Sequence, residues 1–340
     1  MEVRGIDPSD EEALVEWTAV LRASDEELWP GLTGFTLPDI RAFARFDGTC
    51  KRFELVAAAE PGGPMLGVGM MELPLRDNVH GADVTVAVHP DHRRRGVGTA
   101  IVEGMSERAR ADGRRVLNSI VDVPLHRASD HASRFFAPRL GFEARLTGNL
   151  RHLALPVPDA RMDELRTEVA RARDAAAYRI LTFEAPWPGE YVEDQCALFM
   201  CMSTDEPHGD DGHEEEIWDR ARVRENDALR VARDARFLIA AALHVPSGRL
   251  VACTELSLAA DAPGQAWQML TVVHPEHRGH RLGLAVKVAN VEALARLAPA
   301  VRLIITGNAG VNAPMIAVND MMGFQIASAG CFWQKQLPPG

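Results

Sequence analysis

Two stretches of the chain share one pattern of apolar and polar positions. In the first, residues 84–88 read valine, threonine, valine, alanine, valine, which is the two-residue period of a strand. Pro90 ends that strand, because proline cannot donate to a ladder of hydrogen bonds. From Val97 onward apolar residues recur at helical spacing. Between the strand and the helix lies a basic loop with glycines, at residues 93–98.

The second stretch, residues 270–297, repeats this order of strand, His-Pro pair, basic loop and helix. Arg93 and Arg278 are 185 residues apart, and the Gly-Phe pairs at 141–142 and 323–324 are 182 residues apart. A near-constant offset between separate landmarks indicates a duplicated domain. The offset is far too long for a solenoid repeat.

Strands and helices alternate in the same order on either side of both loops, which predicts an α/β fold in each half. Each half is expected to hold a mixed, mostly antiparallel sheet flanked by helices. The expected strands cover residues 3–6, 53–59, 65–73, 84–88, 115–121, 150–155, 178–183, 237–243, 250–258, 267–273, 301–306 and 324–336, with a further strand beginning at Phe142. The expected helices cover residues 97–111, 132–140, 193–202, 215–233, 282–297 and 313–322, with one more opening after Pro8.

Three parts follow from this order. The first domain is predicted at residues 1–156, because Pro156 closes its last expected strand, and the second at residues 178–340. Residues 157–177 join them. This segment includes a run rich in arginine, glutamate and alanine at 162–177, which predicts a solvated linker helix.

Composition narrows the class of protein. No run of about 18 apolar residues occurs, so no membrane span is expected, and the first residues lack the pattern of a signal peptide. Five cysteines without a CxxC pair argue against a disulfide framework or a zinc ribbon, which favours a cytoplasmic protein. A net charge of −11 disfavours nucleic-acid binding and favours a cationic substrate such as an amine.

The strongest run of charge lies at residues 205–216, where two histidines stand among carboxylates. We interpret it as an acidic loop that opens a helix, with acids in the first turn, and not as a metal site. Such a loop could attract a polycationic amine. No metal is expected elsewhere.

The basic loops suit the capture of an anion. A helix N-terminus has unsatisfied N–H groups and a partial positive charge. Glycines let the backbone approach a ligand closely, and arginines add charge that suits phosphate oxygens. The loop at 93–98 is not a Walker loop, because no Gly-Lys-Ser/Thr ends it, and it lacks the third glycine of a dinucleotide fingerprint. A cradle for a pyrophosphate is therefore predicted.

At these residues the chain resembles the GCN5-related N-acetyltransferases (the GNAT superfamily), in a tandem arrangement similar in layout to mycothiol synthase. Arg93-x-x-Gly96-x-Gly98 is similar to the family's motif A, whose loop holds the pyrophosphate of acetyl-CoA. The second copy, Arg278-x-x-Arg281-x-Gly283, departs from it, because Arg281 replaces the first glycine. The resemblance implies that acetyl-CoA is bound by Val86, Val88, Arg93, Arg94, Arg95, Gly96, Val97 and Gly98, and by Thr271, Val273, Arg278, Gly279, His280, Arg281, Leu282, Gly283, Asn308, Asn312 and Asn319.

Catalytic residues also follow from the resemblance. The family often has a glutamate base on the strand before the cradle strand, where Glu255 and Glu72 stand, and an asparagine just past the next strand, here Asn312. Asn312 is also a suitable helix N-cap before Ala313-Pro314. The tyrosine that many members use as the acid is absent, because Ala137 and Asn319 occupy its two positions.

The function expected from these residues is transfer of the acetyl group of acetyl-CoA to a primary amine of a small molecule, by direct attack. The second half is the expected site of the chemistry, as in mycothiol synthase. Two alternatives stay open: a non-catalytic tandem module that binds acyl-CoA or regulates, and a transferase that uses another acyl-CoA. The chain is expected to be a monomer or a homodimer.

Overall fold

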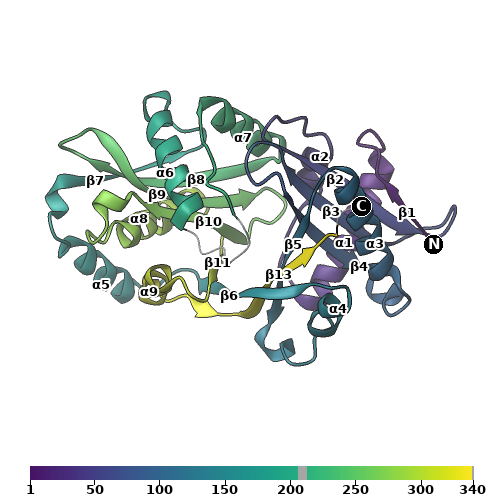
Figure 1. Ribbon diagram of the computed structural model, residues 1–340. Coiled ribbons are helices and arrows are strands. Elements are labelled where there is room, and N and C mark those ends of the chain that lie inside the picture. Colours follow the sequence, from purple (N-terminus) through teal and green to yellow (C-terminus); the bar gives the residue numbers. More distant parts are fainter. Residues whose placement is uncertain (206–212, 339–340) are drawn as a thin grey trace. The chain divides into compact units, whose positions relative to one another are not determined.

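The computed structural model describes residues 1–205 and 213–338, and they form two compact units (Figure 1). Of the described residues, the N-terminal unit contains 1–147, 213–214 and 328–338, and the C-terminal unit contains 148–205 and 215–327. Each unit has a mixed, mostly antiparallel sheet with flanking helices. The predicted fold class is therefore confirmed.

The sheet of the N-terminal unit runs in the order β1-β2-β3-β4-β5-β13. Its strands are β1 (Glu2–Gly5), β2 (Lys51–Ala59), β3 (Met65–Pro74), β4 (Gly81–Val88), β5 (Val116–Pro124) and β13 (Ser328–Gln336). Neighbouring strands are antiparallel except β4 and β5, which are parallel. The helices are α1 (Glu11–Leu28), α2 (Leu37–Ala44), α3 (Val97–Ala111) and α4 (Ser133–Arg139).

The sheet of the C-terminal unit has the same plan, in the order β6-β11-β10-β9-β8-β7. Its strands are β6 (Glu143–Ala154), β7 (Tyr178–Glu184), β8 (Ala235–His244), β9 (Arg249–Ala259), β10 (Gln265–Val273) and β11 (Leu303–Ala309), and the short β12 (Gln325–Ile326) pairs with β6. Here β10 and β11 are the parallel pair. The helices are α5 (Asp159–Ala170), α6 (Val192–Asp205), α7 (Arg220–Ala232), α8 (Leu282–Leu297) and α9 (Ala313–Met322).

Two strands depart from the predicted division of the chain. Residues 148–154 of β6 pair with β11 inside the C-terminal unit. The last strand, β13, pairs along its whole length with β5 inside the N-terminal unit, as Figure 1 shows for the yellow arrow beside β5. The compact units therefore do not follow the sequential division at residues 156 and 177. The sequence pattern also split β6 into two strands, whereas it is a single strand of 12 residues.

The helices differ in whether a side chain caps their first N–H groups. Asp10 caps α1, Thr36 and Asp39 form a capping box on α2, and Asn312 caps α9 through Met315 N. The predicted N-cap role of Asn312 is confirmed. By contrast, α3 and α8 begin with no side-chain cap among the described residues, so their first N–H groups are not satisfied in this way.

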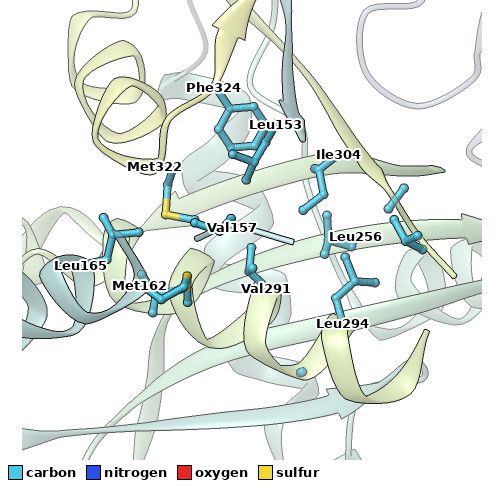
Figure 2. Close-up of a cluster of buried hydrophobic side chains, with 14 of the residues drawn as sticks. Leu153, Val157, Met162, Leu165, Leu256, Val291, Leu294, Ile304, Met322 and Phe324 are labelled. Carbon is cyan, nitrogen blue, oxygen red and sulfur yellow. The ribbon is translucent and has the colours of Figure 1, made fainter. Parts of the chain in front are cut away.

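The segment predicted as a solvated linker helix is part of a core. α5 packs against α8, and Met162 and Leu165 are buried with Leu153, Val157 and Phe324 (Figure 2). Burial of two large side chains stabilises this position by roughly 3–6 kcal/mol. The prediction of a solvated helix was wrong, because two apolar positions one helical turn apart are enough to fix one face of an otherwise charged helix.

Two further expectations from the sequence concern a membrane span and the acidic run at residues 205–216. No described helix combines the length and the apolar character that a membrane crossing needs. Of the acidic run at 205–216, residues 206–212 lie outside the described residues. The helix expected at 215–233 begins only at Arg220, where Asp219 is the N-cap.

Candidate functional site

The two basic loops follow the same backbone path. Loop 1 is residues 93–98, between β4 and α3, and loop 2 is residues 278–283, between β10 and α8. Each comes directly after a short 3-10 turn, Pro90–His92 or Pro275–His277. The strand, turn, loop and helix predicted around each cradle are thus present in both units.

The second and fourth positions of both loops are left-handed. In loop 1 these are Arg94 (φ 64°) and Gly96 (φ 82°), and in loop 2 they are Gly279 (φ 81°) and Arg281 (φ 54°). Each loop therefore has one glycine and one arginine at these positions, in exchanged order. Because a non-glycine residue pays roughly 1–2 kcal/mol for this conformation, Arg281 keeps the path of the cradle at a cost in stability. Loss of the motif's first glycine does not alter the loop.

The first arginine of each loop braces the loop instead of pointing freely outward. Arg93 Nε donates to Val88 O and Arg278 Nε donates to Val273 O, both at 3.2 Å. The guanidinium of Arg93 also pairs with Glu27 of α1. Arg278 pairs in the same way with Asp205 at the end of α6. These side chains hold the end of the cradle strand, and their predicted contact with acetyl-CoA stays a prediction.

The remaining charges differ between the loops. Arg94 and Arg95 of loop 1 are exposed, and neither has an ion pair within the described chain. In loop 2, Arg281 pairs with Glu168 of α5, and His280 Nδ1 lies 2.9 Å from Arg173 O. Loop 1 thus presents two uncompensated positive charges to an anion, whereas loop 2 relies more on backbone N–H groups.

Behind each loop the two parallel strands separate, and we call the point where their pairing stops the parting. Pairing of β10 with β11 runs from Gln265–Leu303 to Gln268–Thr306 and stops there, although both strands continue. Pairing of β4 with β5 likewise stops at Asp83–Asn118. Beyond these points the facing backbone groups of the two strands are open to a ligand. No pattern in the sequence indicates where a parallel pair stops pairing, so this feature was not predicted.

A β-bulge marks the parting in the C-terminal unit. The register between β9 and β10 shifts between Gln268 and Leu270. Gln268 Nε2 donates to Thr254 Oγ1 and to Glu255 O, both at 2.7 Å, and Thr254 Oγ1 is 2.7 Å from the hydroxyl of Thr271. Bulges are common next to active sites, where they redirect a strand. Here the bulge directly follows Gln268, the residue at which the pairing of β10 with β11 stops.

Glu255 is fully buried, at 0% exposure. Its carboxylate accepts hydrogen bonds from Trp187 Nε1 at 3.2 Å and from Arg230 Nη2 at 2.5 Å. Arg230 also lies over the ring of Phe237. The sequence pointed to a buried carboxylate on this strand, but it did not identify Trp187 or Arg230, which are 68 and 25 residues away.

Glu72 does not occupy the position that matches Glu255. Val88 and Val273 end the two cradle strands and both accept from the loop arginine, so Leu270 matches Thr85. Thr85 pairs with Met70, and Leu270 pairs with Glu255. The matching residue is therefore Met70, which is 5% exposed. Glu72 lies two residues further on, half-buried, with its carboxylate 2.7 Å from Lys51 Nζ. The predicted equivalence of the two glutamates was wrong, because Glu255 stands 23 residues before Arg278 and Glu72 only 21 before Arg93.

A polar network lies at the parting of β10 and β11. Asn308, near the end of β11, accepts a hydrogen bond through Oδ1 from Asn319 Nδ2 at 3.2 Å. Asn319 is 0% exposed, and its Oδ1 accepts from Lys287 Nζ at 2.9 Å. Asn308 and Asn319 were predicted from the resemblance. Lys287 was not, because a single lysine within an apolar helix looks like a solvent-facing residue in sequence.

The N-terminal unit has apolar residues at the three positions that match Lys287, Asn319 and Asn308. Counting from Arg93 and Arg278, Val102 matches Lys287, and the Gly-Phe pairs make Ala137 match Asn319. Counting from the paired residues Val116 and Leu303, Val121 matches Asn308. A cavity of about 700 Å³ opens on this unit beside β5 and β13, with Val121, Val123, Cys331 and Trp333 in its walls.

No tyrosine replaces the missing acid at either parting. Positions 137 and 319 are Ala137 and Asn319, on α4 and α9. The hydroxyl of Tyr178 lies 3.0 Å from His277 Nδ1, in the 3-10 turn before loop 2. Burial is the main cause that lowers the pKa of His277, and the nearby histidines His244, His274 and His280 add to it.

Comparisons with known proteins agree with this geometry. Residues 52–144, which include loop 1, match the family model of the acetyltransferase (GNAT) domain. A solved tandem GNAT protein from the clavulanic acid biosynthesis pathway is 28% identical, with a TM-score of 0.80 over 100% of this chain and 99% of that one. None of the curated protein sequences compared with the chain matches it.

Two more distant structures share the fold. A GCN5-related N-acetyltransferase from Sphaerobacter thermophilus is 16% identical, with a TM-score of 0.65 over 100% of this chain and 96% of that one. A GCN5-related glucosamine N-acetyltransferase region of a fungal multi-domain GH3 β-N-acetylglucosaminidase is 14% identical. Its TM-score is 0.66, over 98% of this chain and 38% of that one.

Proposed function

We propose that this chain is a tandem member of the GNAT superfamily, and that its C-terminal unit transfers the acetyl group of acetyl-CoA to the primary amine of a small molecule. One observation carries the proposal. The C-terminal unit combines an uncapped helix start behind loop 2, parted parallel strands, and polar side chains at the parting. The N-terminal unit has the first two features, but apolar residues stand at the matching positions of the third.

In this proposal the chain acts mainly by positioning. Loop 2 and the first N–H groups of α8 suit a pyrophosphate, because they combine backbone donors with a partial positive charge. The open edges of β10 and β11 suit a pantetheine arm, whose amides need backbone partners. The amine attacks the thioester carbon directly, so holding both reactants in place supplies much of the rate.

Glu255 is the proposed base, acting on the amine through water. Its carboxylate already accepts two hydrogen bonds, from Trp187 and Arg230, and each oxygen retains a further lone pair. Full burial means that no amine reaches it from bulk solvent directly. We leave the general acid unassigned, so the leaving thiolate takes its proton from water in this scheme.

The N-terminal unit is proposed to bind acyl-CoA without chemistry. The free arginines Arg94 and Arg95 suit phosphate oxygens. The carboxylate of Glu72 is held by Lys51 and stands two residues from the position of Glu255. This unit has Met70, Val102, Val121 and Ala137 at the positions that match Glu255, Lys287, Asn308 and Asn319. The hydroxyl of Ser119, next to the last paired residue of β5, donates to Val84 O at 2.9 Å.

The acceptor is proposed to be a small cationic amine. The net charge of −11 favours the approach of a cation. A cationic acceptor must lose a proton before it can attack, which fits a buried carboxylate near the parting. The chain is proposed to work in the cytoplasm, as a monomer or a homodimer.

A matched pair of variants tests which unit works, in an assay of CoA release from acetyl-CoA with a library of primary amines. Gly283→Glu puts a carboxylate into loop 2. The added Cβ would meet Val273 and Val318 only at 3.8 and 3.9 Å, so the fold tolerates it. Like-charge repulsion of the pyrophosphate should lower CoA release about 100-fold or more.

The control is Arg94→Glu combined with Arg95→Glu, which reverses charge on loop 1. Gly98→Glu is a poorer control, because its Cβ would lie 3.0 Å from Phe136 Cζ and disturb packing. CoA release should survive the double substitution within about threefold, since surface charges act mainly on association. If the loop 1 variant abolishes release and Gly283→Glu does not, the C-terminal unit is not the catalytic one.

A second function is favoured by one observation: both oxygens of Glu255 are engaged by Arg230 and Trp187, and no tyrosine stands at either parting. These features suit a module that binds acyl-CoA without turning it over. That function predicts heat of binding with acetyl-CoA and no thiol release with any amine of the library. Thiol release that depends on the amine excludes it.

A further inference from the structure

The C-terminal unit buries a lysine that the chemistry above does not use. Lys287 of α8 is 2% exposed, and its Nζ donates to Asn319 Oδ1 at 2.9 Å and lies 5.3 Å from the centre of the Phe324 ring. A buried ammonium without a carboxylate is costly. Burial accordingly lowers the pKa of Lys287 to about 7.

The acids on the elements around α8 are paired elsewhere. Glu168 of α5 pairs with Arg281, and Glu292 on the outside of α8 pairs with Arg166. Glu255 of β9 pairs with Arg230, and Asp320 of α9 pairs with Arg151. The hydrogen bond to Asn319 and the ring of Phe324 are thus the favourable polar contacts of the Lys287 ammonium in the described chain.

This arrangement fixes the direction of two amides. An ammonium has three donors and no acceptor, so Asn319 must turn its oxygen toward Lys287 and its NH₂ group toward Asn308. Asn308 must then accept through Oδ1, which leaves its own NH₂ group as the donor at the parting of β10 and β11. That NH₂ group has one long contact of 3.3 Å, to Ala309 O.

We propose that Lys287 is a positioning residue of the C-terminal site. Its ammonium orders the donors and acceptors of the chain Lys287–Asn319–Asn308, so that Asn308 offers an N–H to a carbonyl oxygen of the ligand. The ligand group is an amide or thioester carbonyl of an acyl-pantetheine arm. This inference rests on the proposed function of the same site, and it adds the residue that sets the direction of its hydrogen bonds.

The N-terminal unit supports a functional reason for the lysine. At the matching positions it has Val102, Ala137 and Val121, and its strand order and loop path are the same. The fold therefore does not need this network. A fold that forms with a buried valine gains nothing in stability from a buried ammonium in its place, so we ascribe the ammonium to ligand binding.

Two variants of this network separate positioning from packing. Lys287→Met keeps the volume and removes the donor, so Asn319 can turn either way. Asn319→Asp still provides a partner for Lys287, because the new carboxylate forms an ion pair with the ammonium. A carboxylate has only acceptors, so Asn308 must turn its NH₂ group toward Asp and its oxygen toward the ligand. The second variant therefore folds well but presents the wrong group.

Affinity for acetyl-CoA is measured by calorimetry at pH 6, where Lys287 is an ammonium. The parent chain carries Arg94→Glu and Arg95→Glu, so that the heat comes from binding at loop 2. Lys287→Met should weaken Kd about 3- to 10-fold, as expected for one hydrogen bond. Asn319→Asp should weaken it about 10- to 100-fold, because a carbonyl then faces an oxygen. Its melting temperature should not fall. Asn290→Leu, at another buried polar residue of α8 that donates to Leu238 O, is the matched control and should leave Kd unchanged.

The outcomes are distinguishable. Unchanged Kd in both Lys287→Met and Asn319→Asp overturns the role of Lys287 and leaves the proposed function intact. An equal loss in Asn290→Leu also overturns it, since the effect would then be one of packing. No binding at all in the parent with the two loop 1 substitutions overturns both the proposed function and this inference.

Discussion

The two units share one backbone plan and differ in what they bury at the parting of the parallel strands. Both have the same strand order, the same two left-handed positions in the loop, and an uncapped helix behind it. At four matching positions the N-terminal unit has methionine, two valines and alanine. The C-terminal unit has glutamate, lysine and two asparagines there. Because the same plan forms with apolar residues, the polar set is not required for folding.

The two loops differ in unpaired charge, and here the N-terminal unit is the more polar one. Loop 1 has two free arginines, and loop 2 has its arginines paired with Asp205 and Glu168. Unpaired positive charge in the loop and polar side chains at the parting are thus on different units. This division fits one unit that binds and one that reacts, and each of the predictions below breaks or sharpens it.

The largest expected effect is the loss of stability when the buried ion pair of Glu255 and Arg230 is broken. Glu255→Gln leaves the buried Arg230 guanidinium with the more distant carboxylate of Asp227, 3.6 Å away, which should lower the free energy of unfolding by about 3 kcal/mol. Glu72→Gln removes a half-exposed pair with Lys51 and should cost less than about 1 kcal/mol. Urea unfolding followed by tryptophan fluorescence measures both. Equal losses would show that the two glutamates have equivalent surroundings.

Activity needs a variant in which that stability is restored. Glu255→Gln with Arg230→Met removes both charges of the pair and should recover part of the unfolding free energy, since Asp227 then loses Arg230 as its partner. If Glu255 is the base, CoA release stays low in the double variant although the protein is folded. Turnover that returns with stability would remove Glu255 from the proposed chemistry.

A smaller effect concerns the dependence of stability on pH. The pKa of Lys287 is lowered from 10.5 to about 7 in the folded chain. Below pH 7 the group is charged in both states, so the cost of burial is felt in full. Between pH 7 and 10.5 it is neutral when folded and charged when unfolded, so stability rises with pH across this window. Lys287→Met should lose that rise.

Thermal melting at several pH values from 6 to 10 checks the sign. The melting temperature of Lys287→Met relative to the natural chain should be highest at pH 6 and should fall as pH approaches 10. Asn290→Leu, at a group that does not titrate, should show a constant difference instead. A difference that grows with pH for Lys287→Met would mean that the lysine is not buried in a charged form at low pH.

The sequence predicted the parts of the fold that depend on local pattern. Periodicity located the strands and helices around both loops, and the constant offset indicated the duplication. It did not indicate that β13 pairs with β5 or that β6 crosses into the other sheet, because strand pairing depends on contacts far apart in the chain. The matched position of Glu255 was missed for a simpler reason, since the glutamate in the first half stands two residues closer to its loop arginine than Glu255 does.

The site was predicted where it depends on motifs and missed where it depends on burial. Loop 1, loop 2, Asn308 and Asn319 follow from spacing and resemblance. Lys287 gives no signal in sequence, because an isolated lysine within a helix usually faces solvent. Its burial depends on tertiary structure, because it is 2% exposed and bonded to Asn319 of α9.

The smallest expected effect is on the left-handed arginines, and it compares the loops directly. Arg94→Gly relieves a strained φ and loses no ion pair, so it should raise the free energy of unfolding by about 0.5–1 kcal/mol, after the extra freedom of glycine in the unfolded chain is deducted. Arg281→Gly relieves the same strain but gives up the pair with Glu168, so it should gain less. Urea unfolding resolves the order of the two. An Arg94→Gly chain that is less stable than the natural one would mean that Arg94 has a stabilising contact in loop 1, and the contrast between a free and a paired loop would fail there.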